Sequence, residues 1–232
     1  MGTTQMGPPR DLILQLKQAY KVQHFIETGT YLGQTASWAA SQFADVHTIE
    51  AQSSLHEAAK QRFPDQGISW HLGDTRTCLP RVLKELKGPG IFWLDAHWSG
   101  GITFGEAAED ECPLLEELAI LRSDLRDHFI LIDDARLFLS PPQQPHRIES
   151  WPSIDRVIDA LRTAADPYIV IHEDVIISVP RRAQSLVARY CQEASTHAWQ
   201  AQQSKAQAAR SSSLPKRLMG MFRSRRSERA AA

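Results

Sequence analysis

The sequence has few cysteines and no long apolar run. The three cysteines, Cys78, Cys112 and Cys191, lie far apart and form no CxxC pair. Neither a disulfide framework nor a cysteine-based zinc site is therefore indicated, and a reducing compartment is favoured. No stretch approaches the roughly 20 apolar residues that cross a bilayer, and Met1–Arg10 lacks the apolar core of a signal peptide. These absences predict a cytoplasmic protein.

An overall charge bias is also lacking, but the charge is unevenly distributed. The 26 Lys and Arg residues nearly balance the 27 Asp and Glu residues, so the composition gives no clear indication of a nucleic-acid partner. Residues 201–232 carry eight basic residues and one acid, or +7, which leaves −8 for residues 1–200. This low-apolar, basic end is typical of a disordered, solvated tail. The alternative is weak contact with an anionic membrane surface.

Short β-rich runs alternate with helix-period segments from residue 24 to about residue 180, which predicts a mostly parallel sheet with helices on both faces. We expect seven strands, at His24–Thr28, Val46–Ala51, Ile68–Gly73, Ile91–Ala96, Phe129–Asp134, Tyr168–His172 and Val175–Val179. Helices are expected at Leu12–Tyr20, Gln34–Phe43, Ser53–Phe63, Leu79–Leu86, Leu114–Leu121 and Ile154–Leu161.

Only Glu173 and Asp174 separate the last two expected strands. Two residues cannot form a parallel crossover, so these strands must pair as an antiparallel hairpin. A length of 232 residues suits one well-buried domain better than two. We expect a domain over residues 1–190, followed over residues 191–232 by a helix and a disordered basic tail.

The first strand runs into a glycine-containing turn, Glu27-Thr28-Gly29-Thr30-Tyr31-Leu32-Gly33. Glycines there let the backbone approach a ligand, and the following helix presents free N–H groups, so a cofactor site is predicted. A tight strand-to-helix turn without a ligand is the alternative. The turn is not a dinucleotide fingerprint, because Tyr31 stands where the second glycine would be, and no phosphate-loop GK[ST] follows.

Two acids follow the next strands. Glu50 closes the second strand about twenty residues after the glycines, where a carboxylate can accept both hydroxyls of a ribose. Its alternative role is a solvated carboxylate that opens the next helix. Asp74, in Gly73-Asp74-Thr75, either contacts an adenine or caps the following helix.

Three aspartates form the strongest candidate site. Asp95 follows the fourth strand, and Asp133 and Asp134 follow the fifth. Ligands of open α/β sheets bind outside the carboxyl ends of the strands, so these side chains should converge there. Two unit charges about 4 Å apart repel by roughly 4 kcal/mol at an effective dielectric constant near 20, which favours a cation or a raised pKa. All-oxygen ligands suit Mg²⁺; the alternative is that Asp133 and Asp134 are turn residues.

Taken together, the runs FIETGTYLGQT, HTIEA, GDT, FWLDAH and FILIDDA resemble the class I S-adenosylmethionine-dependent methyltransferases. The resemblance covers about residues 20–180 and is closest to cation-dependent O-methyltransferases, namely catechol O-methyltransferase and the sugar O-methyltransferases of macrolide biosynthesis. In the sugar enzymes two adjacent aspartates end the fifth strand, as Asp133 and Asp134 do here. The resemblance implies a Rossmann-like fold.

The resemblance also implies roles for particular residues. Glu27, Gly29, Tyr31 and Gly33 would line the methionine part of S-adenosylmethionine, Glu50 would bind its ribose, and Asp74 and Thr75 its adenine, with Asp95 also at the cofactor. Asp95, Asp133 and Asp134 would hold Mg²⁺. The metal would lower the pKa of an acceptor hydroxyl and set its oxygen in line with the sulfonium methyl group.

This sequence departs from the resemblance at the catalytic base. The lysine base of the catechol enzyme is replaced here by Trp98, and His97 or His172 is the nearest substitute beside Asp95. His97 has the alternative role of a packed loop histidine. The glycine-rich, acidic insert Ser99–Cys112 is either a lid over the acceptor or an ordinary loop.

The leading hypothesis is a Mg²⁺-dependent O-methyltransferase that acts on a hydroxylated small molecule or a sugar. A metal-dependent hydrolase or phosphatase-like enzyme using the aspartates is the second hypothesis, although it leaves Glu50 without a task. The third is a non-catalytic module that keeps the cofactor site. The sequence leaves the acceptor and a homo-oligomer open.

Overall fold

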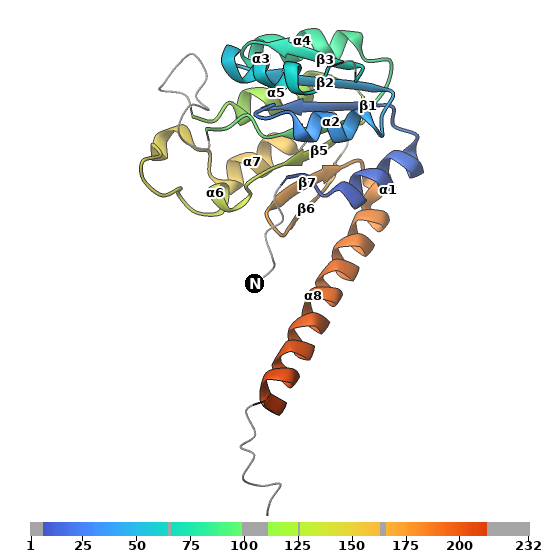
Figure 1. The fold of residues 1–232 in the computed structure, drawn as a ribbon. Coiled ribbons are helices and arrows are strands. Elements are labelled where there is room, and N and C mark those ends of the chain that lie inside the picture. Colours follow the sequence, from blue (N-terminus) through green and yellow to red (C-terminus); the bar gives the residue numbers. More distant parts are fainter. Residues whose placement is uncertain (1–6, 65, 99–110, 125, 163–165, 213–232) are drawn as a thin grey trace, which may run out of the picture. The chain divides into compact units, whose positions relative to one another are not determined.

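The computed structural model describes residues 7–64, 66–98, 111–124, 126–162 and 166–212. Within these ranges seven strands form one sheet: β1 (His24–Thr28), β2 (Asp45–Glu50), β3 (Ile68–Leu72), β4 (Gly90–Leu94), β5 (Phe129–Ile132), β6 (Tyr168–His172) and β7 (Val175–Val179). Their order is β3-β2-β1-β4-β5-β7-β6 (Figure 1). Strand β7 is antiparallel to β5 and β6, and the other pairs are parallel. The predicted α/β fold and its antiparallel hairpin are confirmed.

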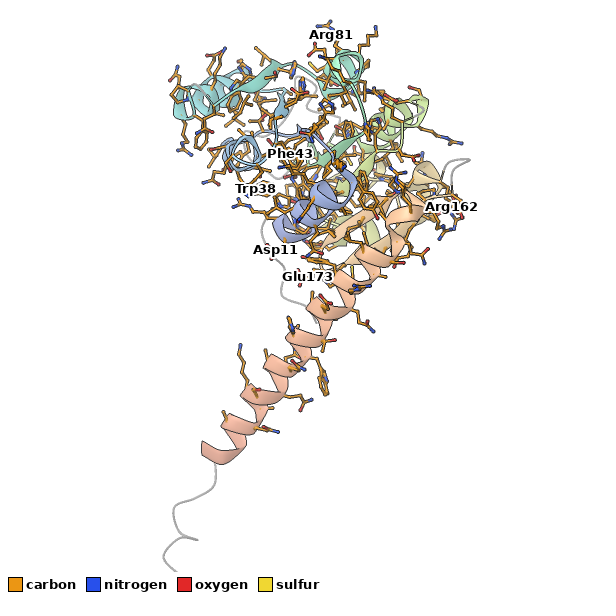
Figure 2. The ribbon with its side chains drawn as sticks, turned by 90° about the vertical axis from the view of Figure 1, so that its right-hand side faces the viewer. Asp11, Trp38, Phe43, Arg81, Arg162 and Glu173 are labelled. Carbon is orange, nitrogen blue, oxygen red and sulfur yellow. The ribbon has the colours of Figure 1, made fainter. Side chains whose placement is uncertain are left out.

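The helices are α1 (Arg10–Tyr20), α2 (Gln34–Ala40), α3 (Ser53–Arg62), α4 (Thr75–Glu85), α5 (Leu114–Ser123), α6 (Arg136–Leu139), α7 (Ile154–Leu161) and α8 (Gln184–Ser212). Helices α4, α5 and α7 pack on one another and over strand side chains such as Ile26 and Phe92. The neighbouring residue Phe25 points to the other face, where its ring meets Trp38 and Phe43, which Figure 2 labels. Side chains alternate along a strand, so the sheet is covered on both faces.

Strand order reverses between β1 and β4, because the chain moves outward from β1 to β2 and β3 and then returns to β4. At such a reversal the loops after neighbouring strands diverge and leave a crevice at the carboxyl edge of the sheet. The turn after β1 and the loops after β4 and β5 meet this edge. The fold therefore brings together segments that lie about seventy to one hundred residues apart in the sequence.

Several element boundaries differ from the sequence prediction. Helix α4 begins at Thr75 rather than Leu79, because the Asp74 carboxylate accepts the backbone N–H of Arg76 at 2.8 Å and caps the helix there. Helix α2 ends at Ala40 rather than Phe43. The short helix α6 and the 3₁₀ turns at Ile148–Ser150 and Arg181–Ala183 have no counterpart in the prediction. None of these differences changes the strand order.

The chain divides after Tyr190 into two units. Residues up to Tyr190 include the whole sheet, and the start of α8 belongs to this unit through the buried Val187. From Cys191 onward the structure describes helical residues as far as Ser212. No helix in the described ranges has both the length and the apolar character of a membrane-spanning segment.

Candidate functional site at the carboxyl edge of the sheet

The turn after β1 is held tightly against its neighbours. Gly29 adopts a φ of +84°, and a Cβ at this position would lie 2.1 Å from the carbonyl oxygen of Asp95. The N–H groups of Gly29 and Thr30 both donate to the carbonyl of Ile49, at 2.9 and 3.2 Å. Only glycine fits this combination of conformation and contact. The turn thus lies directly against the backbone that carries the first of the three aspartates.

Gly33 and Tyr31 complete the turn. Gly33 has a φ of +74° and precedes the first residue of α2, while Tyr31 has a φ of +48° and an exposed side chain. The backbone N–H of Tyr31 donates to Glu50 Oε2 at 2.9 Å. Glu50 fixes the turn in this way and is itself buried, with 6% of its surface exposed. Its Oε1 accepts the N–H of Gln52 at 2.9 Å.

Glu27 is a buried acid at the base of the turn. The hydroxyl of Thr48 donates to Glu27 Oε2 at 2.6 Å, and the Thr48 and Thr30 hydroxyl oxygens are also 2.6 Å apart. Burial, reinforced by the charges of Asp95 and Glu50, raises the pKa of Glu27 to about 8, although the Thr48 hydrogen bond opposes the shift. The side chain is therefore mostly protonated at pH 7, and a bound cation would favour its ionised form.

Asp74 caps α4 and also pairs with Arg76. Its Oδ1 accepts the Arg76 Nε–H at 2.9 Å, and its Oδ2 lies 2.5 Å from Arg76 Nη2. The side-chain hydrogen bonds from Arg76 lower the pKa of Asp74, against the effect of burial. Asp74 thus takes the capping role that the sequence analysis left open. Thr75 follows at the first position of the helix and is buried.

His97 joins the carboxylates that follow β4 and β5. Its Nε2 lies 2.8 Å from Asp134 Oδ2, and its Nδ1 lies 3.7 Å from Asp95 Oδ1. Burial alone would lower the pKa of His97, but the hydrogen bond to Asp134 and the neighbouring carboxylates raise it above the usual value. The ring is buried, so both nitrogens face acids rather than open space. His97 is therefore a packed residue and also a charged partner of the cluster.

Arg136 extends the cluster to the β6–β7 turn. Its Nη1 lies 2.5 Å from Asp134 Oδ1 and also pairs with Asp174 in that turn. The backbone N–H of Arg136 donates to Asp174 Oδ1 at 2.9 Å. Asp134 has a φ of +54° and a pKa below its usual value, because the contacts with His97 and Arg136 outweigh burial. Its charge is already compensated by Arg136 and stabilised by the hydrogen bond with His97.

Asp95 and Asp133 have pKa values above the ordinary value of an aspartate. Burial raises the pKa of Asp95 to about 8, helped by Asp133 and Asp134 and opposed by His97. Burial and the charge of Asp134 raise the pKa of Asp133 to about 6. The backbone N–H of Asp133 donates to the Leu94 carbonyl at 3.1 Å, which holds the two loops together. The three predicted aspartates thus lie close enough to perturb one another.

A metal ion would have to be held by these carboxylates. In the ranges that the structure describes, no three His, Cys, Asp or Glu side chains are arranged so that they could hold one. Oxygen donors of this kind do match Mg²⁺, and an ion would favour the charged forms of Asp95 and Asp133, whose pKa values are raised by burial and by neighbouring carboxylates. Asp134 would first have to exchange His97 and Arg136 for the ion.

The remaining predicted residues lie outside this cluster. The His172 ring, at the end of β6, packs edge-on against Tyr190 with 6.0 Å between the ring centroids. Its Nε2 has no hydrogen-bond partner among the described residues. Trp98 stacks edge-on with His146 at 4.9 Å, and its backbone N–H donates to the carbonyl of Glu111 at 2.7 Å. The predicted lid lies mostly in 99–110, outside the described residues.

The sequence analysis missed Glu117, a buried acid on α5 between the two parts of the site. Burial raises its pKa to about 7, opposed by Thr75, Thr28 and His97. Its Oε1 has no hydrogen-bond partner among the described residues. A signal existed, because Glu117 lies on the apolar stripe of Leu114, Leu118 and Leu121, where a charged side chain must be buried.

Glu111 was also missed. Its carboxylate accepts hydrogen bonds from Trp151 Nε1 at 2.7 Å and from the Arg147 backbone at 3.0 Å, and it contacts His146 Nδ1 at 3.2 Å. Burial would raise its pKa, but these donors lower it below the usual value. Glu111 ties the end of the insert to the loop before α7. No sequence pattern marks it, because its partners are 35 to 40 residues away.

Comparison of the sequence with protein-family models gives no match, and neither does comparison with curated proteins. Solved structures do match. The O-methyltransferase TomG from Streptomyces achromogenes, involved in tomaymycin synthesis and solved with SAM, is 16% identical with a TM-score of 0.54, over 76% of this chain and 81% of that one. An O-methyltransferase from Bacillus cereus, solved with SAH, is also 16% identical with a TM-score of 0.50, over 77% and 84%. At this identity the matches establish the fold, which is that of the class I methyltransferases.

Proposed function

We propose that the chain is an S-adenosylmethionine-dependent O-methyltransferase that acts on a hydroxyl group of a small molecule or sugar, with the activity residing in residues 1–190. The observation that carries the proposal is the contact of Gly29 with the backbone of Asp95. This contact places the turn after β1, which suits a cofactor, beside the three aspartates, which suit an acceptor. Methyl transfer requires that these two ligands meet in line.

In this proposal the cofactor lies across the carboxyl edge of β1, β2 and β3. Gly29, Tyr31 and Gly33 line its methionine part. Burial keeps Glu27 protonated in the free protein, and the positive charge of the cofactor would cause Glu27 to lose this proton. Glu50 is already buried and oriented by two backbone N–H groups, and its remaining lone pairs can accept the ribose hydroxyls. Asp74 and Thr75 lie at the start of α4, beside the expected adenine.

We propose that Asp95, Asp133 and Asp134 hold Mg²⁺ when cofactor and acceptor are bound. The ion would supply Lewis-acid stabilisation of the acceptor oxygen. Support comes from the oxygen-only donor set and from the raised pKa values of Asp95 and Asp133, which burial and the neighbouring carboxylates cause. The proposal requires one change from the observed arrangement: Asp134 would leave His97 and Arg136 and bind the ion instead.

In this proposal Asp95 is the base that takes the proton from the acceptor hydroxyl. This carboxyl is partly exposed, and its pKa of about 8 means that it carries a proton at pH 7 in the free protein. This proton would first leave to solvent when the cations bind, and the carboxylate would then accept the proton of the acceptor hydroxyl. His97 is buried between Asp95 and Asp134 and acts as the positioning residue for both carboxylates. His172 packs against Tyr190, and the proposal gives it no role in catalysis. The acceptor oxygen then displaces the sulfur of the cofactor directly.

Calorimetry and a methyl-transfer assay test the proposal. We expect S-adenosylmethionine to bind the full chain, and labelled methyl groups to be transferred to some member of a panel of hydroxylated acceptors. Asp133→Ala should abolish turnover while cofactor affinity stays within a few-fold, whereas Asp159→Ala, an exposed aspartate on α7, should behave like wild type. Absence of cofactor binding would refute the proposed function. Full turnover after chelation of divalent ions would refute only the metal assignment.

A further inference from the structure

A second cavity lies at the opposite edge of the sheet. Its walls come from the end of α5, the loop into β5, the end of α7 and the residues after β7. Strand β5 begins and antiparallel β7 ends at this amino edge, away from the loops that carry Asp95 and Asp133. The cavity therefore belongs to neither the expected cofactor site nor the expected acceptor site.

The cavity is large enough for a small molecule. Its volume is about 560 Å³, within the range of roughly 300–1,000 Å³ that is typical of ligand pockets. The apolar part of its lining includes Leu118 and Leu121 from α5, Ile130 from β5, and Ala160 and Leu161 from α7. Such a lining favours a ligand with an apolar body, because the ligand removes apolar surface from water.

One buried polar group in the lining, His128, has Asp124 as its neighbour. His128 is 8% exposed, and its Nδ1 accepts the N–H of Gly90 at 3.0 Å. Burial lowers the pKa of His128 to about 4, so at neutral pH the ring is uncharged and its single hydrogen lies on Nε2. Nε2 has no hydrogen-bond partner among the described residues, and Asp124 Oδ2 lies 3.5 Å away. The ring N–H therefore faces the Asp124 carboxylate, and the free charge of the lining has to come from another residue.

The charged groups of the lining are predominantly basic. Four arginines outnumber two aspartates there: Arg122, Arg126, Arg181 and Arg182 against Asp124 and Asp127. Arg126 is held by Asp124 and by the carbonyls of Leu83 and Leu86. Arg122 is exposed and has no ion-pair partner among the described residues, so its charge is available to a ligand.

We propose that this cavity binds a small molecule that has an apolar body and a carboxylate head group. The apolar walls take the body, and the carboxylate pairs with the exposed guanidinium of Arg122. A carboxylate fits better than a hydroxyl, because the group available to pair with it is a cation. The proposal is independent of the proposed methyl transfer.

Octanoate is the probe, with 1-octanol as its uncharged counterpart, and binding to the full chain is measured by calorimetry. We expect octanoate to bind at least roughly tenfold more tightly than octanol, equivalent to about 1.4 kcal/mol. Saturation with S-adenosylmethionine should leave the octanoate affinity unchanged. No octanoate binding, equal binding of octanol, or displacement of octanoate by S-adenosylmethionine would overturn the proposal.

Two variants locate the site, each with a control. Ala160→Leu fills the cavity and should remove octanoate binding, while Ala119→Leu on the exposed side of α5 should not. Arg122→Gln should weaken octanoate binding several-fold and leave octanol unaffected, while Arg62→Gln at the exposed end of α3 should have no effect. Thermal unfolding checks that each variant folds. Octanoate binding that survives both Ala160→Leu and Arg122→Gln would place it elsewhere and refute the assignment.

Discussion

Gly29 and Asp95 meet backbone to backbone, with no room for a side chain at residue 29. A Cβ on Gly29 would lie 2.1 Å from the Asp95 carbonyl oxygen and 2.6 Å from its carbonyl carbon. Both contacts involve backbone atoms, which cannot move aside as a flexible side chain could. The contact joins the turn after β1 to the loop after β4, and these are the two halves of the proposed site.

Gly29→Ala is therefore expected to destabilise the protein and to disrupt cofactor binding. The left-handed conformation costs an alanine about 1–2 kcal/mol, and the overlap with Asp95 should bring the loss of unfolding free energy to at least about 3 kcal/mol. Gly67→Ala is the control, because Gly67 has a φ of +67° and open space around a Cβ. Equal losses in the two variants, measured by urea denaturation, would show that the contact with Asp95 is unimportant.

Cofactor binding should release protons through Glu27. Its pKa of about 8 in the free protein means that the side chain carries a proton at pH 7. A bound sulfonium or ammonium group would lower this pKa, so up to one proton should leave per cofactor. Calorimetry at pH 7 in buffers of different ionisation enthalpy measures the release. In Glu27→Gln we expect weaker binding without proton release, and unchanged release would remove Glu27 from the site.

His97→Asn should lower kcat by roughly 10- to 100-fold, a common cost of losing a residue that orients functional carboxylates. Cofactor affinity should stay within a few-fold, because His97 contacts Asp95 and Asp134 rather than the turn after β1. His172→Asn, in which the ring contact with Tyr190 is lost, serves as the comparison and should retain kcat. The reverse result, with turnover lost only in His172→Asn, would transfer the role to His172.

Glu117 should make the protein less stable as the pH rises. Its pKa is about 7 in the folded protein, against an ordinary value of 4.5. Between these values the unfolded chain loses the proton and the folded protein keeps it, so the stability that is present below pH 4.5 declines until about pH 7. The loss is on the order of 3 kcal/mol for this buried group.

Glu117→Gln should remove the part of the decline that Glu117 causes, while the raised pKa values of Glu27, Asp95 and Asp133 leave the rest in place. The variant should therefore lose less stability than wild type between pH 5 and pH 8. Denaturation by urea at pH 5 and at pH 8 measures the difference for both proteins. Glu116→Gln, at the exposed neighbouring position, is the control and should keep the wild-type slope. A slope in Glu117→Gln equal to that of wild type would mean that Glu117 does not contribute to it.

Much of the fold could be predicted from local patterns. Strands such as Phe129–Ile132 are short apolar runs bounded by polar residues, and the two-residue link at Glu173 and Asp174 required a hairpin. Boundaries were less predictable where a side chain decides them, as at Asp74, whose capping hydrogen bond starts α4 before the apolar stripe begins. The carboxyl-edge rule for open sheets predicted that the aspartates would share one edge, and they do perturb one another.

The amino-acid sequence by itself determined the order of the strands and helices, the glycine turn, and the residues at the strand ends, because each follows from periodicity or from the conformational freedom of glycine. Only the tertiary structure decided the partners of those residues. It placed His97 between two acids, paired Asp134 with Arg136, buried Glu117 beside the site and left His128 facing a cavity. The reason is physical: hydrogen bonds, ion pairs and burial depend on distances between segments far apart in the chain, and those distances exist only after the sheet has formed.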